Sequence, residues 1–269
     1  LQYAIILLGF GMNLFEIFRV GSQSLLIIIS TIGTALVVSY AVSRIMKIDH
    51  DIATLVGVGS SICGGSAIAA AAPVIKASDE DIAQSISVIF LFNVIAAFLF
   101  PTLGAILGFN DMGFGMWAGT AINDTSSVVA AGQTWASASG SDTALNYATI
   151  VKLTRTLAII PICLGLAYLT SKRKATTSEV KISSIFPMFI IYFLGASIIN
   201  TFAGSHFDFF QFLPAIGKFM IAMAMAAIGL NTNLVKLIKT GGKPILLGLI
   251  CWFCIAVVSL AMQHLLNIW

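Results

Sequence analysis

Long apolar runs separated by short polar connections fill this chain from one end to the other. A bilayer core requires about 20 consecutive apolar residues per helix, and nine runs meet that requirement. The runs are continuous and lack the ten-residue alternation of barrel strands. The pattern therefore predicts an all-α polytopic transmembrane bundle that forms a single membrane domain over 1–269. The predicted segments are 2–18, 24–43, 52–75, 83–107, 113–135, 146–169, 184–202, 214–232 and 244–267.

Composition supports the same class. The 269 residues are 58% hydrophobic and 9% charged, whereas a soluble domain is about 25% charged. The 14 Lys and Arg and the 11 Asp and Glu are too few to form the charged shell of a globule. This excludes a cytosolic enzyme, a secreted disulfide scaffold, a disordered chain and a nucleic-acid binder.

The orientation follows from Lys and Arg in the short loops. Nine of them lie in the loops 44–51, 170–183 and 233–243. The opposite side carries three, which are Arg19, Lys76 and Lys218. We therefore expect the nine-positive side of this multi-pass protein to be cytoplasmic.

Two internal repeats bear on the architecture. Residues 7–21 and 227–241 match at an offset of 220, with Asn13 opposite Asn233 and Gly21 opposite Gly241. The loop charges indicate that these two copies cross the membrane in opposite directions, which is typical of secondary transporters built from inverted repeats.

A weaker repeat has an offset of 60 and relates 58–66 to 119–127. Both stretches are rich in Gly, Ser and Thr, and Gly costs about 1 kcal/mol relative to Ala inside a helix. Such runs at membrane depth indicate broken or re-entrant helices. If both stretches re-enter, a single membrane crossing separates them and the pair is inverted. Lys76 then lies on the cytoplasmic side, and the count of Lys and Arg on the two sides becomes 10 to 2. The sequence leaves spanning and re-entry open.

Three charges lie neither in loops nor at the ends of predicted segments: Asp124, Lys152 and Arg155. Each costs about 2.5–3.5 kcal/mol at a helix centre. Lys152 and Arg155 share a helix face because they are three residues apart, and Asp124 would offset part of their desolvation cost. One positive charge is left over, which favours an anionic substrate or a coupling proton on Asp124. The structural alternative is a buried ion pair that pins two helices together.

The broken segments supply further groups for an anion site. A half-helix that starts inside the membrane directs free N–H groups and a positive dipole end at its surroundings. Close helix packing through small residues is the alternative explanation. Asn13 and Thr232 lie at the breaks of the first repeat pair. The full set of candidate substrate-binding residues is Lys152, Arg155, Asp124, Asn123, Thr125, Ser126, Ser61, Cys63 and Ser66.

Enzyme chemistry finds no support in the sequence. The histidines, His50, His206 and His264, lie in loops or near a segment end, so no deep serine has a base to activate it. An aspartyl intramembrane protease needs two deep acids, and only Asp124 qualifies. The chain has no HExxH metal motif and no Walker loop. We therefore expect neither catalysis nor a bound metal or cofactor.

Four motifs resemble one known family. They are Ser61-Ile-Cys-Gly-Gly-Ser-Ala-Ile-Ala through Pro73-Val-Ile-Lys76, Trp117-Ala-Gly-Thr-Ala-Ile-Asn-Asp-Thr through Val129-Ala-Ala-Gly132, Val151-Lys-Leu-Thr-Arg155, and Ala226-Ala-Ile-Gly-Leu230. Together they resemble the YeiH-type sulfate exporter family of bacterial inner-membrane proteins. The resemblance implies a fold related to the cation/proton antiporter and bile-acid symporter superfamily, and about two further helices before Leu1.

The resemblance also bears on the proton pathway. Many family members carry a histidine where this chain has Asn123, and an asparagine does not titrate near neutral pH. A proton relay through this position would therefore fall to Asp124 alone.

These observations lead to one expected function. The chain is expected to be a secondary transporter that moves a small anion of the sulfate or organosulfur type by alternating access. Lys152 and Arg155 would bind the anion, and Asp124 would couple a proton or cation or gate the site. The expected partners are this anion, the coupling ion and the lipid bilayer, without nucleic acid; a homo-oligomer stays open. An anion channel and a non-transporting membrane sensor or assembly component are the alternatives.

Overall fold

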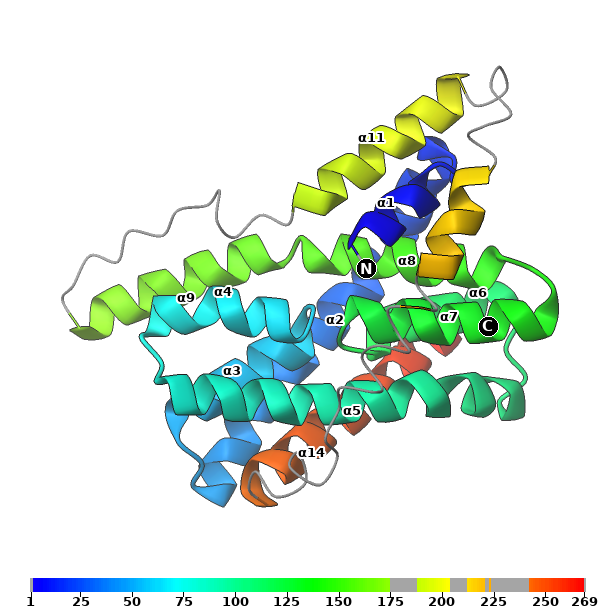
Figure 1. Cartoon of the computed structure of the whole chain (residues 1–269). Coiled ribbons are helices and arrows are strands. Elements are labelled where there is room, and N and C mark those ends of the chain that lie inside the picture. Colours follow the sequence, from blue (N-terminus) through cyan, green and yellow to red (C-terminus); the bar gives the residue numbers. More distant parts are fainter. Residues whose placement is uncertain (1, 175–187, 204–211, 221–222, 224–241, 269) are drawn as a thin grey trace.

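The computed structural model describes residues 2–174, 188–203, 212–220, 223 and 242–268 (Figure 1). Every regular element within these ranges is a helix, which confirms the predicted all-α class. Within the described ranges, four helices are long and apolar enough to cross a membrane. They are Leu14–Met46, Asp79–Ile106, Thr143–Thr170 and Gly242–Leu265.

The predicted first segment, 2–18, is wrong as a single helix, but its break lies at Asn13, where the repeat placed one. Helix α1 (Gln2–Gly9) ends early, and α2 (Leu14–Met46) starts after a short break. Asn13 causes the restart because its side-chain oxygen accepts a hydrogen bond from the Phe15 N–H at 2.8 Å, which is a strong N-cap interaction. Helix α2 absorbs the predicted segment 24–43.

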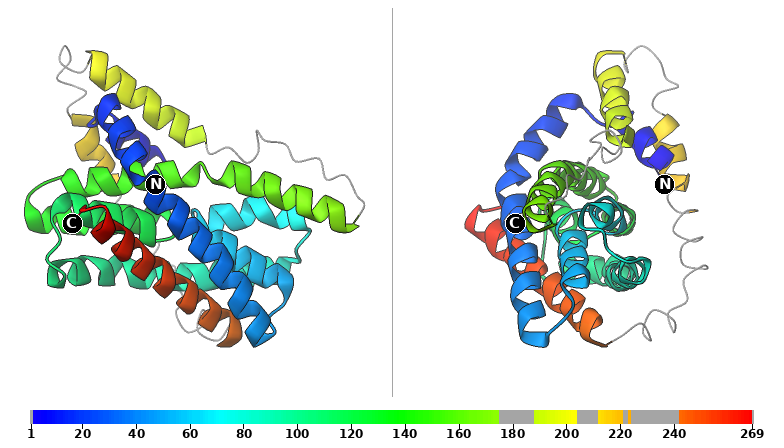
Figure 2. Two further views of the ribbon diagram at one scale, coloured as in Figure 1. Left: turned by 180° about the vertical axis from the view of Figure 1, so that it is seen from behind. Right: turned by 90° about the vertical axis from the view of Figure 1, so that its left-hand side faces the viewer.

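Helix α2 has a partner from the far end of the chain. Helix α14 (Gly242–Leu265) packs beside it, and the two run diagonally across the remaining bundle (Figure 2). At 33 residues, α2 is about 50 Å long, which exceeds the roughly 30 Å of a hydrocarbon core. Its oblique course accommodates the excess length.

The segment predicted at 52–75 is a re-entrant hairpin. It consists of α3 (His50–Ser61) and α4 (Gly65–Ile75), which pack against each other. His50 and Ile75, at the two ends of the hairpin, line the same cavity, so the chain returns to the end of the molecule where it entered. The tip needs Gly64, whose φ of 69° is in the left-handed region that glycine adopts without steric cost.

The segment predicted at 113–135 folds in the same way. It consists of α6 (Asp111–Ala121) and α7 (Thr125–Ser139). The Trp135 indole N–H donates to the Asp111 carboxylate at 2.7 Å, so the end of α7 returns to the start of α6.

The two hairpins enter from opposite ends of the molecule because the single crossing α5 (Asp79–Ile106) separates them (Figure 1). Their breaks, at 62–64 and 122–124, are 60 residues apart. The weaker sequence repeat is therefore an inverted structural repeat, and re-entry places Lys76 on the side where the nine loop charges lie, which is the side predicted to be cytoplasmic.

Among the remaining described helices, the pair at 143–174 packs on these hairpins. Helix α8 (Thr143–Thr156) continues into α9 (Ile159–Lys174) through a short turn, because Pro161 has no N–H to return to the Leu157 carbonyl. Helix α11 (Met188–Ala203) packs on α1. Residues 212–220 are helical, whereas the repeat copy 227–241 with Thr232 lies outside the described residues, so the offset of 220 stays a prediction.

Helix α8 approaches α6 closely because two glycines face it. A Cβ added to Gly119 would lie 2.7 Å from the Val151 Cβ, and one added to Gly115 would lie 2.6 Å from the Tyr147 Cβ. Gly115 and Gly119 form the G-x-x-x-G spacing that lets membrane helices pack closely. This contact holds the polar face of α8 against the hairpin tips.

Candidate functional site

The tips of the two hairpins meet at Lys152, on α8. Its side chain is fully buried. The ammonium group donates three hydrogen bonds to backbone carbonyls, at 2.6 Å to Ile62, 3.1 Å to Ile122 and 2.5 Å to Asn123. Lys152 therefore uses its full donor capacity to tie the α3–α4 tip to the α6–α7 tip.

Arg155, one turn along α8, makes a parallel set of contacts. It is also fully buried. Its Nε donates to the Ser61 carbonyl at 2.8 Å, Nη2 to the Ser60 carbonyl at 2.7 Å and Nη1 to the Thr120 carbonyl at 2.6 Å. Arg155 thus also joins the end of α3 to the end of α6.

These contacts explain how two cations are tolerated at membrane depth. The last carbonyls of a helix have no intrahelical partner, and the C-terminal end carries roughly half a negative charge. Helices α3 and α6 both end inside the bundle, so each needs donors and positive charge there. Lys152 and Arg155 supply these donors and this positive charge. The same contacts offset the cost of removing the two cations from water.

The expected partnership between Asp124 and the two bases is not a direct ion pair. Among the described residues, no carboxylate lies within 4.0 Å of Lys152 or Arg155. Both Asp124 oxygens instead accept from the Ser127 N–H at 3.3 Å, so Asp124 is the N-cap of α7. The cause is local, because the carboxylate reaches the first turn of its own helix more readily than a cation already occupied by carbonyls.

A cavity of about 310 Å³ adjoins this junction, at the N-terminal ends of α4 and α7. Five of the nine predicted site residues line it, and the other four belong to the buried junction next to it. The lining five are Cys63, Ser66, Asp124, Thr125 and Ser126. The junction residues are Ser61, Asn123, Lys152 and Arg155.

The start of α4 is an open source of hydrogen-bond donors. Gly64, its N-cap residue, makes no side-chain cap, whereas α7 is capped by Asp124. Gly65 and Ser66, in the first turn of α4, line the cavity. The Ala67 N–H is already hydrogen-bonded to the Cys63 thiol, so the N–H groups of Gly65 and Ser66, together with the helix dipole, are those that favour an anion.

Asn93 on α5 is a site residue that sequence reasoning missed. It is 2% exposed and lines the cavity. Its Oδ1 accepts from the Asn123 N–H at 3.2 Å, which orients the amide and leaves Nδ2 as a donor without a partner among the described residues. The available signal was a lone asparagine in the middle of a 28-residue apolar helix, because polar residues at membrane depth mark sites.

Two more polar groups at the hairpin tips lack partners. The Ser60 hydroxyl and both amide atoms of Asn123 are buried without a hydrogen bond. Most buried polar atoms in proteins have a hydrogen-bond partner. The unpaired atoms here therefore mark the place where the two hairpin tips meet. Among the described residues, no group of three or more His, Cys, Asp or Glu is arranged to hold a metal ion.

Comparisons with known proteins agree on the family. The family model described as conserved hypothetical protein 698 matches residues 1–248. A UPF0324 membrane protein of Streptococcus pyogenes serotype M3 is 58% identical, covering 100% of this chain and 81% of the relative. A UPF0324 membrane protein of Fusobacterium nucleatum is 55% identical, covering 100% and 82%. No solved structure matches. These names establish a membrane protein family and assign no substrate.

Proposed function

This chain belongs to the conserved hypothetical protein 698 family of membrane proteins, and we propose that it is a secondary transporter for a small anion. The observation that carries the proposal is the cavity at the N-terminal ends of α4 and α7. These half-helices belong to hairpins that enter from opposite ends of the molecule. Transporters built from inverted repeats place their substrate sites at such discontinuous helices.

The charges at the crossing favour an anion. Four half-helix ends meet there, and their partial charges of about +0.5 and −0.5 cancel in sum. Lys152 and Arg155 add two positive charges and Asp124 adds one negative charge. The cations sit on the C-terminal ends of α3 and α6, so the N-terminal end of α4 is left to act on the cavity.

The geometry changes the roles expected for the two bases. Lys152 and Arg155 already donate to six carbonyls, so we assign them as positioning residues that join the hairpin tips. The direct contacts to the anion come from the start of α4, from Asn93 Nδ2 and from the hydroxyls of Ser66 and Thr125.

Asp124 is the coupling group in this proposal. Its carboxylate lines the cavity and lies at the positive end of α7, where a substrate anion would otherwise be attracted. Protonation of this carboxylate, or a cation bound beside it, removes its repulsion of the anion. Anion occupancy and coupling-ion occupancy then favour each other, which is the linkage a symporter needs.

The lining of the cavity suggests a substrate class. The lining combines hydroxyl and amide groups with the apolar side chains of Ile5, Ile86 and Phe90. An oxyanion with a short apolar part, such as a small sulfonate, suits both kinds of lining, and sulfate uses the polar groups alone. This keeps the sulfate or organosulfur class as the first to test.

Transport by the full chain in proteoliposomes tests the proposal. The panel is sulfate, sulfite, thiosulfate and small sulfonates, measured as labelled flux and as current on a solid-supported membrane. We expect saturable flux that depends on a proton or cation gradient and that Asn93→Asp abolishes by placing a second carboxylate in the cavity. Gly33→Ala is the control, because an added Cβ there meets no atom within 4 Å.

Each other result contradicts the proposal. Flux that follows voltage without saturation or a coupling ion indicates an anion channel. No flux for any anion indicates a non-transporting membrane component. Unchanged flux in Asn93→Asp would show that the transported anion does not pass through this cavity.

A further inference from the structure

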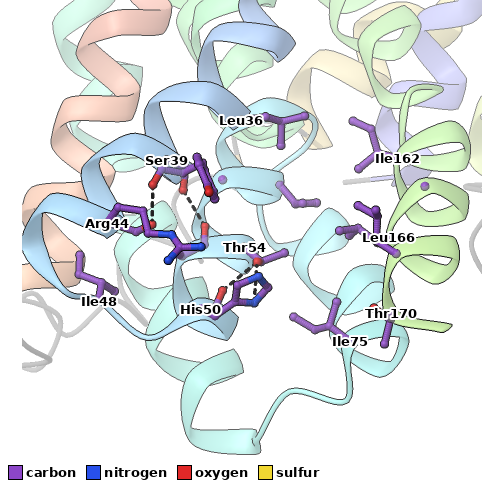
Figure 3. Close-up of a pocket in the computed structure, with 17 residues that line it drawn as sticks. Leu36, Ser39, Arg44, Ile48, His50, Thr54, Ile75, Ile162, Leu166 and Thr170 are labelled. Atoms are coloured by element: carbon purple, nitrogen blue, oxygen red, sulfur yellow. Dashed lines mark hydrogen bonds between the residues drawn. The ribbon is translucent and has the colours of Figure 1, made fainter. Parts of the chain in front are cut away.

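A second cavity, of about 610 Å³, lies between α2, α3, α4 and α9 (Figure 3). It is at the end of the molecule where α2 ends and the α3–α4 hairpin begins, which the loop charges predict to be cytoplasmic. The cavity does not share a lining residue with the anion cavity. It therefore calls for a separate explanation.

The dimensions match the depth of one lipid leaflet. Its walls run from Leu36 to Arg44 on α2 and from Ile162 to Thr170 on α9. Eight residues of helix rise about 12 Å, compared with about 15 Å for half of a hydrocarbon core. The cavity thus extends from the cytoplasmic surface through most of one leaflet.

The walls of the cavity consist mainly of apolar side chains and of hydroxyls that already have hydrogen-bond partners. Leu36 lies across from Ile162 and Leu166 (Figure 3). The two serine hydroxyls in the α2 wall are already used, because Ser39 donates to the Ala53 carbonyl at 2.6 Å and Ser43 donates to the Tyr40 carbonyl at 2.9 Å. A lining of this kind favours a hydrocarbon chain over a small polar anion.

Arg44 provides a charge at the cytoplasmic end. Its guanidinium lies 5.2 Å from the centre of the Tyr40 ring, and it is exposed. No carboxylate of the described residues lies within 4.0 Å of it, whereas the nearby His50 ring is 3.5 Å from the Asp51 carboxylate. A guanidinium fits a phosphate well because its planar fork matches two phosphate oxygens.

We infer that this cavity binds an anionic phospholipid of the cytoplasmic leaflet. One acyl chain lies between α2 and α9, and the phosphate contacts Arg44. The cytoplasmic leaflet is rich in anionic lipids, so the ligand is present where the cavity opens. The lipid fills the space between α2 and α9 beside the α3–α4 hairpin, and this inference stands apart from the transport proposal.

Two variants separate the acyl-chain contact from the headgroup contact. Gly165→Leu fills the cavity, because Gly165 lines it and an added Cβ meets no atom within 4 Å. Arg44→Gln removes the charge at an exposed position. The matched controls are Gly33→Leu, where an added Cβ also meets no atom within 4 Å, and Arg19→Gln, nearer the other end of α2.

The experiment is native mass spectrometry of the detergent-purified full chain with phosphatidylglycerol or phosphatidylethanolamine of identical acyl chains. We expect the wild type and both controls to retain one phosphatidylglycerol in preference to phosphatidylethanolamine. Arg44→Gln should lose that preference by about tenfold, the factor that one charge-assisted hydrogen bond supplies. Gly165→Leu should lose retention of both lipids.

Three results overturn the inference. The first is equal retention of the two lipids by the wild type. The second is unchanged retention by Gly165→Leu, which would place the lipid elsewhere. The third is an equal loss in Arg19→Gln, which would indicate a general effect of charge. Size-exclusion elution of each variant establishes that it is folded, and Arg44→Gln, at an exposed position, keeps the headgroup test available if Gly165→Leu misfolds.

Discussion

Replacing Lys152 with methionine tests the assignment of this residue as a joint between the hairpins. Methionine keeps the apolar length of the side chain and removes three hydrogen bonds to the carbonyls of Ile62, Ile122 and Asn123. Each buried carbonyl left without a donor costs about 1–3 kcal/mol. Removing the buried charge itself offsets part of the summed cost of the three carbonyls. The net cost should be close to the roughly 3–5 kcal/mol that is typical when one partner of a buried charged contact is removed.

We therefore expect Lys152→Met to lower the stability of the protein without ligand by about 3–5 kcal/mol, and its melting temperature by about 10 °C. Thermal unfolding in detergent, followed by tryptophan fluorescence, measures this. Trp117 is a suitable reporter because it is buried in α6 and stacks on Phe100 with 4.1 Å between ring centres. Arg155→Lys should lower the melting temperature too, since an ammonium group cannot reproduce the guanidinium fork to Ser60, Ser61 and Thr120.

The matched control is Ser66→Ala, which removes an exposed hydroxyl that lines the cavity without breaking the contact between the tips. It should melt close to the wild type without ligand and lose part of the stabilisation that a bound anion adds. A Lys152→Met protein that melts like the wild type and fails only in anion stabilisation would refute this reasoning, because Lys152 would then be a direct ligand.

The other predictions concern packing, capping and topology. Gly119→Ala should lower the melting temperature, because its Cβ would lie 2.7 Å from a side chain of α8, whereas Gly33→Ala, with nothing within 4 Å, should match or exceed the wild type. Asp124→Ala should cost about 1 kcal/mol of stability through loss of the α7 N-cap, and Asp124→Asn should restore it, since asparagine also caps; both are read from the same melting curves. With re-entrant hairpins, Ser78→Cys should react with an impermeant thiol reagent only from the cytoplasmic side and Ser141→Cys only from the opposite side; labelling of both from one side would contradict the topology.

Much of the candidate site was readable before the structure. The small and polar stretches located both hairpin tips, and five predicted residues line the cavity that lies there. Asn93 was missed because its place in the sequence shows that a polar residue lies within an apolar helix, but it does not show that α5 packs beside the hairpin tips. The direct pairing of Asp124 with the bases was not observed, because spacing along the chain does not show which partner each group reaches first.

The fold divides in a similar way. The apolar run 83–107 predicted α5 to within a few residues, since a buried crossing is continuous and apolar. Hydropathy alone reads 2–18 as one continuous run, whereas the repeat placed a break at Asn13, where the structure has a helix cap. Re-entry at 52–75 and 113–135 depends on packing between half-helices, and hydropathy counts only the length of a run.

The sequence by itself determined that this is a multi-pass helical membrane protein, where its helices break, and which three charges lie deep. These properties are local, because run length, glycine content and the cost of a buried charge depend on neighbouring residues. Only the tertiary structure decided that the hairpins fold back and that Lys152 and Arg155 satisfy carbonyls rather than Asp124. The reason is distance along the chain: Lys152 reaches a carbonyl 90 residues away and Arg155 one 95 away, and no local pattern records such contacts.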